Sequence, residues 1–254
     1  MTQTLAGDFD YDTFGAGYAR RRRPDPRIAA MIHRALGDAP TVLNVGAGAG
    51  SYEPPDRYVL AVEPSAGMRA QRPPGAAPAV DAAAERLPFD DDAFDAVMAT
   101  VTVHQWRDVA RGLAEMRRVA RGPVVVLTFD GAELERHWLA EYVPELIAAE
   151  RRRYPAVATI AAAIGRSAEV IEVPIPIDCV DGFTEAFYAR PEAFLDPAVR
   201  AAQSAWGFVS AEVTGRAVER LRADLASGAW EQRYGHLRSQ PEFVGSLRLL
   251  VGRP

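Results

Sequence analysis

The sequence contains no lysine, so all 29 of its basic residues are arginines. Such a preference is typical of coding bias in a GC-rich bacterial genome and carries no function by itself. The 34 acidic residues give a net charge of −5, and basic residues cluster only at Arg20–Arg23 and Arg151–Arg153. A general nucleic-acid binder needs a clustered basic face. We therefore expect no nucleic-acid partner and interpret both arginine runs as solvated helix ends.

Cysteine and long apolar runs are scarce as well. A single cysteine, Cys179, excludes an intrachain disulfide and a cysteine-rich metal cluster. The four histidines are scattered without metal-ligand spacing, so we expect no metal. No apolar stretch approaches the ~18 residues of a transmembrane helix, and the first residues lack the apolar core of a signal peptide. These absences predict a cytoplasmic protein without a membrane partner.

Glycine, in contrast, is concentrated at one informative place. Residues 41–45 form an apolar run suited to a buried strand, and glycine then occupies positions 46, 48 and 50. Glycine allows a tight turn and lets a ligand approach the main chain without meeting a Cβ. Open α/β sheets bind nucleotides at such a loop. The dinucleotide fingerprint G-x-G-x-x-G requires glycine or alanine where this chain has Ser51, so the loop alone leaves the ligand open.

The rest of the chain reads as alternating strands and helices up to Asp130. We predict strands near 41–46, 58–63, 78–81, 94–100 and 123–129, with helices over 24–37, 65–71 and 108–119. This alternation predicts a parallel sheet covered by helices on both faces. Beyond Asp130, helical patterns occupy 131–165, 191–209 and 215–227, and strands are expected at 170–177 and 243–251. Pro174 and Pro176 would confine the first of these strands to an edge or break it into a bulge.

Two further strings identify the type of ligand. The second apolar strand ends in Glu63, and a carboxylate at that tip can accept hydrogen bonds from both hydroxyls of a ribose. Residues 85–99 read ERLPFDDDAFDAVMA and are followed by VHQW at 103–106 and EMRRV at 115–119. In this order and spacing the strings resemble class I methyltransferases that use S-adenosylmethionine. Within that family they are most similar to small-molecule enzymes of the ubiquinone/menaquinone and trans-aconitate methyltransferase type, over roughly residues 40–130.

The resemblance implies a Rossmann-like fold of the α/β class, with a seven-stranded, mostly parallel sheet, an antiparallel last strand and a helical lid insertion. Residues 1–130 would form the cofactor-binding core with an N-terminal helical cover, residues 131–240 the lid with one sheet strand, and residues 241–254 the final strand. All three parts would belong to one integrated domain. The lid helices would lie over the carboxyl ends of the strands, exclude water and shape the substrate pocket.

The resemblance also implies the residues that contact S-adenosylmethionine and the product S-adenosylhomocysteine. Asn44 stands where many relatives have an acid, and Ala83 stands where relatives often have the aspartate that takes the adenine amino group. An N-terminal aromatic residue and an arginine from Arg20–Arg23 would fold over the cofactor. The expected contacts are Tyr18, Arg23, Asn44, Gly46, Ala47, Gly48, Glu63, Pro64, Met68, Ala83, Ala84, Thr100 and Val101.

His104 is the candidate catalytic residue. It follows the fourth strand, where the sheet order should reverse next to the glycine loop, and its ordinary pKa near 6.5 suits a general base. A histidine that hydrogen-bonds a backbone carbonyl or packs beside the ligand fits the same position. The expected substrate pocket consists of aromatic residues whose spacing also fits a helical core: Trp106, Trp138, Tyr142 and Tyr188.

The function that we expect is methyl transfer to a small organic molecule, at oxygen or at an activated carbon next to oxygen. One alternative is a protein that binds S-adenosylmethionine as a sensor or as a scaffold for another reaction. A second is an NAD-dependent oxidoreductase, although Ser51 and the 85–119 string count against it. We expect the enzyme to act as a monomer or a homodimer.

Overall fold

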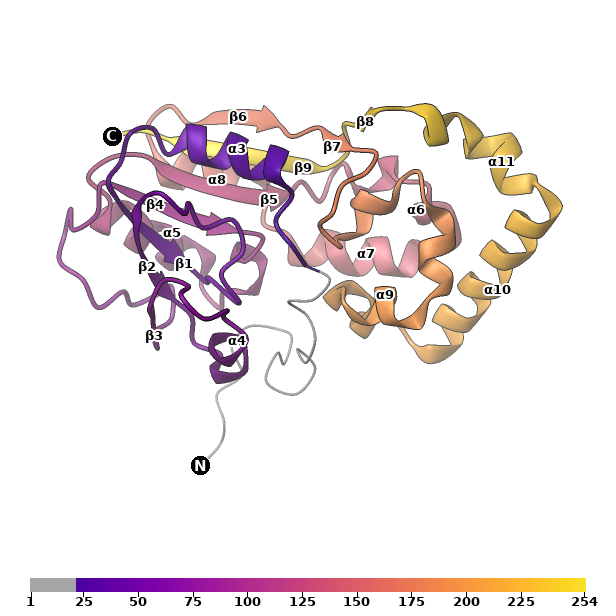
Figure 1. The fold of residues 1–254 in the computed structure, drawn as a ribbon, viewed down its shortest axis with the longest axis horizontal. Helices are drawn as coiled ribbons and strands as arrows, with labels where there is room; N and C mark the ends of the chain where they lie inside the picture. Colours follow the sequence, from indigo (N-terminus) through magenta and orange to yellow (C-terminus); the bar gives the residue numbers. More distant parts are fainter. Residues whose placement is uncertain (1–21) are drawn as a thin grey trace.

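The computed structural model describes residues 22–254 and contains a seven-stranded sheet with the order β3-β2-β1-β4-β5-β9-β6 (Figure 1). Strands β1 to β5 run parallel, and β9 is antiparallel to both of its neighbours, β5 and β6. The predicted Rossmann-like sheet with an antiparallel last strand is confirmed. The strands are β1 (Thr41–Val45), β2 (Tyr58–Val62), β3 (Ala79–Val80), β4 (Ala96–Thr100), β5 (Val124–Phe129), β6 (Glu169–Glu172) and β9 (Leu247–Gly252).

The strand order reverses at β1, which pairs with β2 on one side and with β4 on the other. Ligands of open α/β sheets bind at such a switch point, beyond the carboxyl ends of the strands. The central strands are mostly apolar, and every residue of β5 is buried, as expected for a parallel sheet covered on both faces. The order therefore places the glycine loop, which follows β1, opposite the segment that follows β4.

Alternate strand residues point to opposite faces of the sheet. Both faces are apolar, and helices cover both of them. Helix α3 (Pro26–Ala35) shares one apolar cluster with Val42 and Val125, whereas α5 (Val109–Val119) and α8 (Val157–Ile164) share the other with Leu43 and Val124. Figure 1 shows α3 lying across the sheet. The short helix α4 (Ala66–Ala70) follows β2, and Ser65 caps it, as predicted, by accepting a hydrogen bond from the Met68 amide at 3.1 Å.

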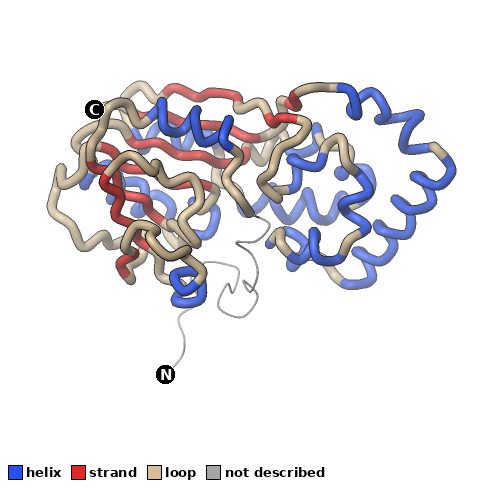
Figure 2. The backbone as a smooth tube through the Cα atoms, viewed as in Figure 1, coloured by secondary structure: helices blue, strands red, loops and turns tan. Residues whose placement is uncertain are grey.

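The remaining helices form a lobe beside the sheet (Figure 2). The strand predicted at 170–177 breaks at its prolines: β6 ends at Glu172, and β7 (Ile175–Pro176) pairs with β8 (Glu242–Phe243) in a separate two-stranded sheet. Within residues 22–254, no helix has the length and apolar character needed to cross a bilayer. The lobe contains η2 (Leu134–Arg136), α6 (Leu139–Tyr142), α7 (Pro144–Arg153), η3 (Thr184–Phe187), η4 (Pro191–Leu195), α9 (Pro197–Ala201), η5 (Ser204–Phe208), α10 (Ala211–Ser227), α11 (Ala229–Tyr234) and η6 (Gly235–Ser239).

The range 131–240 is therefore divided between the lobe and the sheet. Helix α8 belongs to the sheet, because Ile160 and Ile164 are fully buried in the same apolar cluster as Leu113 of α5. Its end is packed so closely that a Cβ on Gly252 of β9 would lie 2.3 Å from the Ile164 carbonyl oxygen. The lobe proper begins with the segment 134–153 and continues from residue 178 to residue 241.

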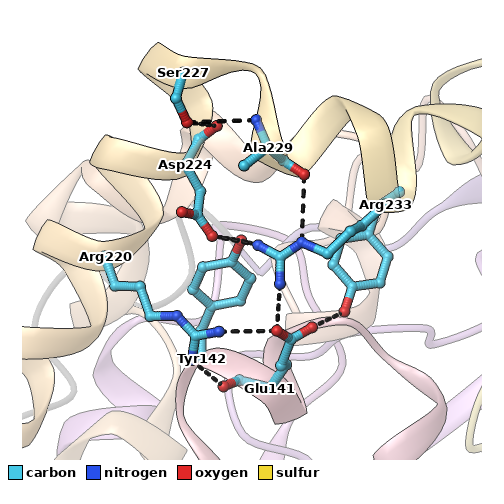
Figure 3. Close-up of polar contacts among 8 residues, drawn as sticks. Glu141, Tyr142, Arg220, Asp224, Ser227, Ala229 and Arg233 are labelled. Atoms are coloured by element: carbon cyan, nitrogen blue, oxygen red, sulfur yellow. Dashed lines mark hydrogen bonds and ion pairs between the residues drawn. The ribbon is translucent and has the colours of Figure 1, made fainter.

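An aromatic interior and a polar surface network hold the lobe together. Trp138 makes edge-to-face contacts with Phe194 and Trp230, with ring centroids 5.7 and 5.6 Å apart. On the surface, Glu141 accepts hydrogen bonds from Arg220 and Arg233, so that α6 is tied to α10 and α11 (Figure 3). Exposed pairs of this kind contribute little individually, so the aromatic interior supplies most of the cohesion.

Two glycines provide a matched test of this packing. Gly252→Ala places a methyl group against the Ile164 backbone, and we expect the free energy of unfolding to fall by about 1–3 kcal/mol. Gly215→Ala, in the middle of α10 with open space at its Cβ, should instead raise it by about 0.5–1 kcal/mol. Chemical denaturation measures both. Equal stability of the two variants would contradict the close approach of α8 and β9.

Candidate active site

The carboxyl ends of β1, β2 and β4 surround a cavity of about 390 Å³, which we call the switch-point cavity. It lies where the strand order reverses. Four segments at the ends of different parallel strands form most of its lining: the glycine loop after β1, residues 63–65 after β2, residues 81–85 after β3, and residues 100–107 at the end of β4 and beyond it. Arg22 and Met68 complete the lining. The volume is in the range of sites for small molecules and cofactors.

The glycine loop needs its glycines for two different reasons. Gly46 and Gly48 have φ values of +66° and +52°, in the left-handed region that side chains other than glycine rarely adopt. A Cβ on Gly46 would lie 2.3 Å from Oγ1 of Thr102, so this glycine admits the segment after β4. A Cβ on Gly48 would meet the end of Met68 at 3.2 Å on the cavity wall. The loop thus brings bare backbone to the cavity.

Glu63 is held at the cavity by the backbone. Its Oε2 accepts the Gly48 amide and its Oε1 accepts the Ser65 amide, both at 2.8 Å. Burial raises the pKa of this carboxyl above its ordinary value, although both hydrogen bonds act in the opposite direction. Each oxygen retains a lone pair for a further donor. The carboxylate can therefore accept two neighbouring hydroxyl groups from a ligand.

Asn44 lies beneath the loop and supports it from below. Its side-chain amide donates to Glu53 at 3.0 Å. Both carboxylate oxygens of Glu53 also accept hydrogen bonds from the Arg72 guanidinium, each at 2.8 Å. Arg72 in turn donates to the Gly48 carbonyl at 3.4 Å. The predicted cofactor contact at Asn44 is thus placed behind the glycine loop, where it orders the backbone that faces the cavity.

Most other predicted contacts do line the switch-point cavity. Trp106, which we predicted for the substrate pocket, also lines it, with its indole against Gly112 of α5. Glu85 fixes the adjoining wall by accepting the Arg107 amide at 2.8 Å. The predicted cofactor contacts found here are Gly46, Ala47, Gly48, Glu63, Pro64, Met68, Ala83, Ala84, Thr100 and Val101.

Of the two described residues of the run Arg20–Arg23, Arg22 lines the switch-point cavity and the predicted Arg23 does not. Arg22 donates from Nε to the buried Asp181 at 2.7 Å and forms an isolated β-bridge with it. The exposed Arg23 lines a different hollow beside Asp178. Successive side chains of an extended segment point to opposite sides, so a shift of one residue decides which arginine faces the ligand. Tyr18 lies outside the described residues.

A second cavity, of about 50 Å³, lies between the sheet and the lobe, and we call it the lobe cavity. It shares Arg22, Val101 and Gln105 with the switch-point cavity. Val101 has φ of +52°, an unusual value for a β-branched residue, and its amide donates to the Leu127 carbonyl at 2.8 Å. The other lining residues are His104, Phe129, Leu134, His137, Leu146, Ile147, Glu150, Tyr154, Phe183, Thr184, Glu185, Gln203, Ser204 and Ala205.

His104 is buried in this second cavity. Its ring lies 4.6 Å from the Tyr154 ring, measured between centroids. Burial lowers the pKa of the imidazole well below 6.5, and the positive charges of Arg153 and Arg22 lower it further. The ring is therefore neutral across the physiological range, in contrast to the ordinary pKa that we expected from the sequence.

No sequence pattern indicated Glu185, which lines the same cavity. Both of its carboxylate oxygens accept the Ser246 amide, at 3.0 and 3.1 Å. Burial nevertheless raises the pKa of this carboxyl to about 7. The 3₁₀-helix η3 brings Glu185 against the start of β9, which follows it by some sixty residues, so no local pattern marks the site.

The three other residues predicted for a substrate pocket lie in the interior of the lobe. Trp138 donates from its indole to the Tyr188 carbonyl at 2.8 Å, and Tyr188 donates from its hydroxyl to the Gln240 carbonyl at 2.6 Å. Tyr142 packs edge-to-face on Trp138 with centroids 5.7 Å apart. Their aromatic spacing thus marks a helical core, which was the alternative interpretation of the pattern.

Comparisons with known proteins agree with this geometry. A family model for a methyltransferase domain matches residues 43–126, from β1 to β5. A solved structure from Anabaena variabilis, described as a methyltransferase from an antibiotic biosynthesis pathway, is 29% identical with a TM-score of 0.85. The similarity covers 92% of this chain and 99% of that chain, and so includes the lobe. No curated protein sequence matches this chain.

Two more distant structures share the fold. An S-adenosylmethionine-dependent methyltransferase from Thermotoga maritima, described as a possible histamine N-methyltransferase, is 19% identical with a TM-score of 0.52, covering 65% of this chain and 84% of its own. Phosphoethanolamine N-methyltransferase 2 from Haemonchus contortus is 13% identical with a TM-score of 0.52, covering 89% of this chain and 52% of its own. The methyltransferase domain over the glycine loop and Glu63, and the likeness of the whole chain to the Anabaena variabilis structure, support a class I S-adenosylmethionine-dependent methyltransferase.

Proposed function

We propose that this methyltransferase acts on a small organic molecule bound in the lobe cavity, at an oxygen or at a carbon next to an oxygen. The observation that carries the proposal is that the two cavities adjoin and share Arg22, Val101 and Gln105. A donor in the switch-point cavity and an acceptor in the lobe cavity would meet at this boundary. The small volume of the lobe cavity supports a compact acceptor rather than a macromolecule.

The residues of the switch-point cavity fit the cofactor. S-adenosylmethionine, when bound, supplies a methyl group on a positively charged sulfur. Glu63 would accept hydrogen bonds from the two ribose hydroxyls, while Gly48 keeps the approach to the backbone open. The backbone of Ala83 and Ala84 would border the adenine. Arg22 would offer its guanidinium to the carboxylate of the amino-acid part, a partner that suits its planar fork.

The lobe would serve as the lid over the reaction. Its apolar residues Leu146, Ile147 and Phe183 line the lobe cavity and would exclude water. The acceptor atom takes the methyl group, and the electron pair of the broken carbon–sulfur bond stays on sulfur. Most of the acceleration of such an in-line displacement can come from positioning. The rigid carboxyl edge of the sheet and the packed lobe would provide that positioning.

A neutral acceptor must also lose a proton, and two groups at the lobe cavity could receive it. His104 is neutral because burial lowers its pKa, so it could receive a proton only at Nε2, and the side-chain amide nitrogen of Gln105, 3.3 Å away, would have to release that lone pair first. Glu185 has a pKa raised to about 7 and is thus partly ionised at neutral pH. Weak bases of this kind suit an acceptor that is itself acidic, such as an enol or a phenol.

Cofactor binding should depend on the charge of Glu63. We expect Glu63→Gln to weaken S-adenosylhomocysteine by roughly ten- to a hundred-fold, because a hydrogen bond to a charged acceptor contributes about 1.5–3 kcal/mol. In the wild type the affinity should fall as pH falls through the raised pKa of Glu63, because the bound hydroxyls favour the ionised form. Calorimetry across pH measures both effects. Glu212→Gln, exposed on α10, is the control, and unchanged binding by the Glu63 variant would remove the ribose assignment.

Turnover should depend on His104. If it receives the proton, His104→Ala should lower the rate of methyl transfer by about 10²–10⁴ and leave the affinity for S-adenosylhomocysteine nearly unchanged. The acid limb of the wild-type pH–rate profile should lie below the ordinary histidine range, because burial lowers the pKa. His236→Ala, exposed on η6, is the control. Normal turnover by the His104 variant would leave positioning and the acceptor's own acidity to explain the chemistry.

The burial of Glu185 should appear in the stability of the protein. Between pH 4.5 and about pH 7 the folded chain retains a proton on Glu185 that the unfolded chain releases, so stability falls as pH rises through this window. Glu185→Gln mimics the protonated form. The variant should therefore gain about 3 kcal/mol relative to wild type from about pH 5 to about pH 8.

Denaturation curves at both pH values provide this comparison, with Glu242→Gln, an exposed carboxyl, as the control. If the Glu185 variant and the wild type keep a constant difference in stability across pH, the carboxyl of Glu185 is ionised in the folded protein throughout and its raised pKa is wrong.

A further inference from the structure

Three buried nitrogen atoms at the lobe cavity have no hydrogen-bond partner among the described residues: Nδ1 of His104, Nε2 of His137 and Nε2 of Gln203. The residues are only 8%, 2% and 5% exposed. Leaving a buried polar group unpaired costs about 1–3 kcal/mol, and such groups are rare in folded proteins. Three of them around one small space indicate a site built for polar atoms that come from outside the chain.

The hydrogen bonds of His137 and Gln203 identify both unpaired atoms as donors. Nδ1 of His137 accepts the Leu139 amide at 3.1 Å, and burial lowers the pKa of this ring to about 3, so the neutral ring carries its hydrogen on Nε2. Oε1 of Gln203 accepts the Thr184 hydroxyl at 2.8 Å, so the unpaired atom is the amide nitrogen.

The third unpaired atom is a donor as well. The side-chain amide nitrogen of Gln105 lies 3.3 Å from Nε2 of His104. An amide NH₂ group can only donate, so Nε2 of His104 accepts. The ring is neutral, and its hydrogen must therefore reside on Nδ1, which is the unpaired atom. All three unpaired groups at the lobe cavity thus present N–H bonds.

The two carboxylates of the cavity, in contrast, each already accept at least one hydrogen bond from the chain. The carboxylate of Glu185 accepts the Ser246 amide, and that of Glu150 is paired with Arg153. Much of the remaining surface is apolar, including Phe129 and Leu146. A ligand here would meet spare donors and apolar walls. An ammonium group has no lone pair, so it would leave the three unpaired N–H groups without a partner.

Building on the proposed function, we infer that the methyl acceptor presents hydrogen-bond-accepting oxygens, as a carboxylate or a keto–enol group, to the N–H groups of His104, His137 and Gln203. One water needs roughly 10–15 Å³ of cavity of this kind, so about 50 Å³ holds a head group of a few heavy atoms. The acceptor is then a compact carboxylic or carbonyl compound whose reacting oxygen or carbon is close to this head group. Amines belong to a different class of acceptor that this site disfavours.

The test uses the full chain loaded with S-adenosylhomocysteine and three probes of similar size: benzoate, acetophenone and benzylamine. Calorimetry should show binding of benzoate or acetophenone at millimolar concentration and weaker or no binding of benzylamine. Benzylamine binding as tightly as either oxygen compound, or no binding of both oxygen compounds, would overturn the inference.

Matched variants assign the binding to the donors. His137→Asn keeps an acceptor for the Leu139 amide but withdraws the donor from the cavity, so the better-binding oxygen probe should weaken by roughly tenfold or more. His137→Gln, whose amide nitrogen reaches the position of Nε2, should restore part of the loss. Gln203→Met should weaken the same probe similarly, and Gln232→Met, exposed on α11, should not. Unchanged binding in both the His137→Asn and Gln203→Met variants would overturn the inference.

Nitrogen-15 spectra of the histidine rings give a readout that needs no variant. They should show a neutral His104 protonated on Nδ1 and a neutral His137 protonated on Nε2, and the opposite tautomers would contradict the donor assignment. A measurement of S-adenosylhomocysteine binding distinguishes failure of the proposed function from failure of the inferred substrate class. Absence of that binding would reject the proposed function, whereas normal cofactor binding with a preference for benzylamine would reject only the substrate class.

Discussion

The carboxylate of Asp181 joins the three parts of the chain that border the two cavities. It accepts Nε of Arg22 at 2.7 Å and the hydroxyl of Tyr52, also at 2.7 Å, while itself being almost fully buried. Arg22 precedes the first described helix, Tyr52 ends the glycine loop, and Asp181 belongs to the lobe. A buried carboxylate that lost one of these partners would carry a large desolvation cost, so the three segments are held in one arrangement. Both cavities depend on that arrangement, because Arg22 lines each of them.

The two cavities are built from different kinds of structure. Backbone dominates the switch-point cavity, where glycine conformations and the ends of parallel strands place amides and Glu63. Side chains from the lobe dominate the lobe cavity, where Glu185, His137 and Gln203 come from three separate segments. A cavity formed mainly by backbone depends little on which side chains are present. Such a cavity suits a cofactor that does not change from one methyltransferase to another. A side-chain wall can be changed residue by residue, which is what selection of different acceptors requires.

The same difference explains what could be predicted from the sequence. The glycine loop, Glu63 and the cap at Ser65 are contiguous with their strands, so short-range patterns located the switch-point cavity and most of its lining. Which arginine of Arg20–Arg23 faces the cavity could not be read from the sequence, because composition does not distinguish neighbouring residues of an extended segment. Trp138, Tyr142 and Tyr188 were predicted for the pocket, yet a core helix and a pocket helix present aromatics at the same spacing. Glu185, His137 and Gln203 acquire their setting only through contacts between distant segments, which no local pattern records.

Val101 shows how the sheet supports the boundary between the cavities. A β-branched residue with φ of +52° stores roughly 1–3 kcal/mol of backbone strain and persists only where its surroundings determine it fully. Its amide is fixed by Leu127 of β5, and the strand before it is buried on both sides. The turn this conformation imposes directs the chain into η1 (Val103–Gln105), which carries His104 and Gln105 to the lobe cavity. The central strands thus hold a strained residue at the boundary between the two cavities, and the segment that carries His104 begins directly after it.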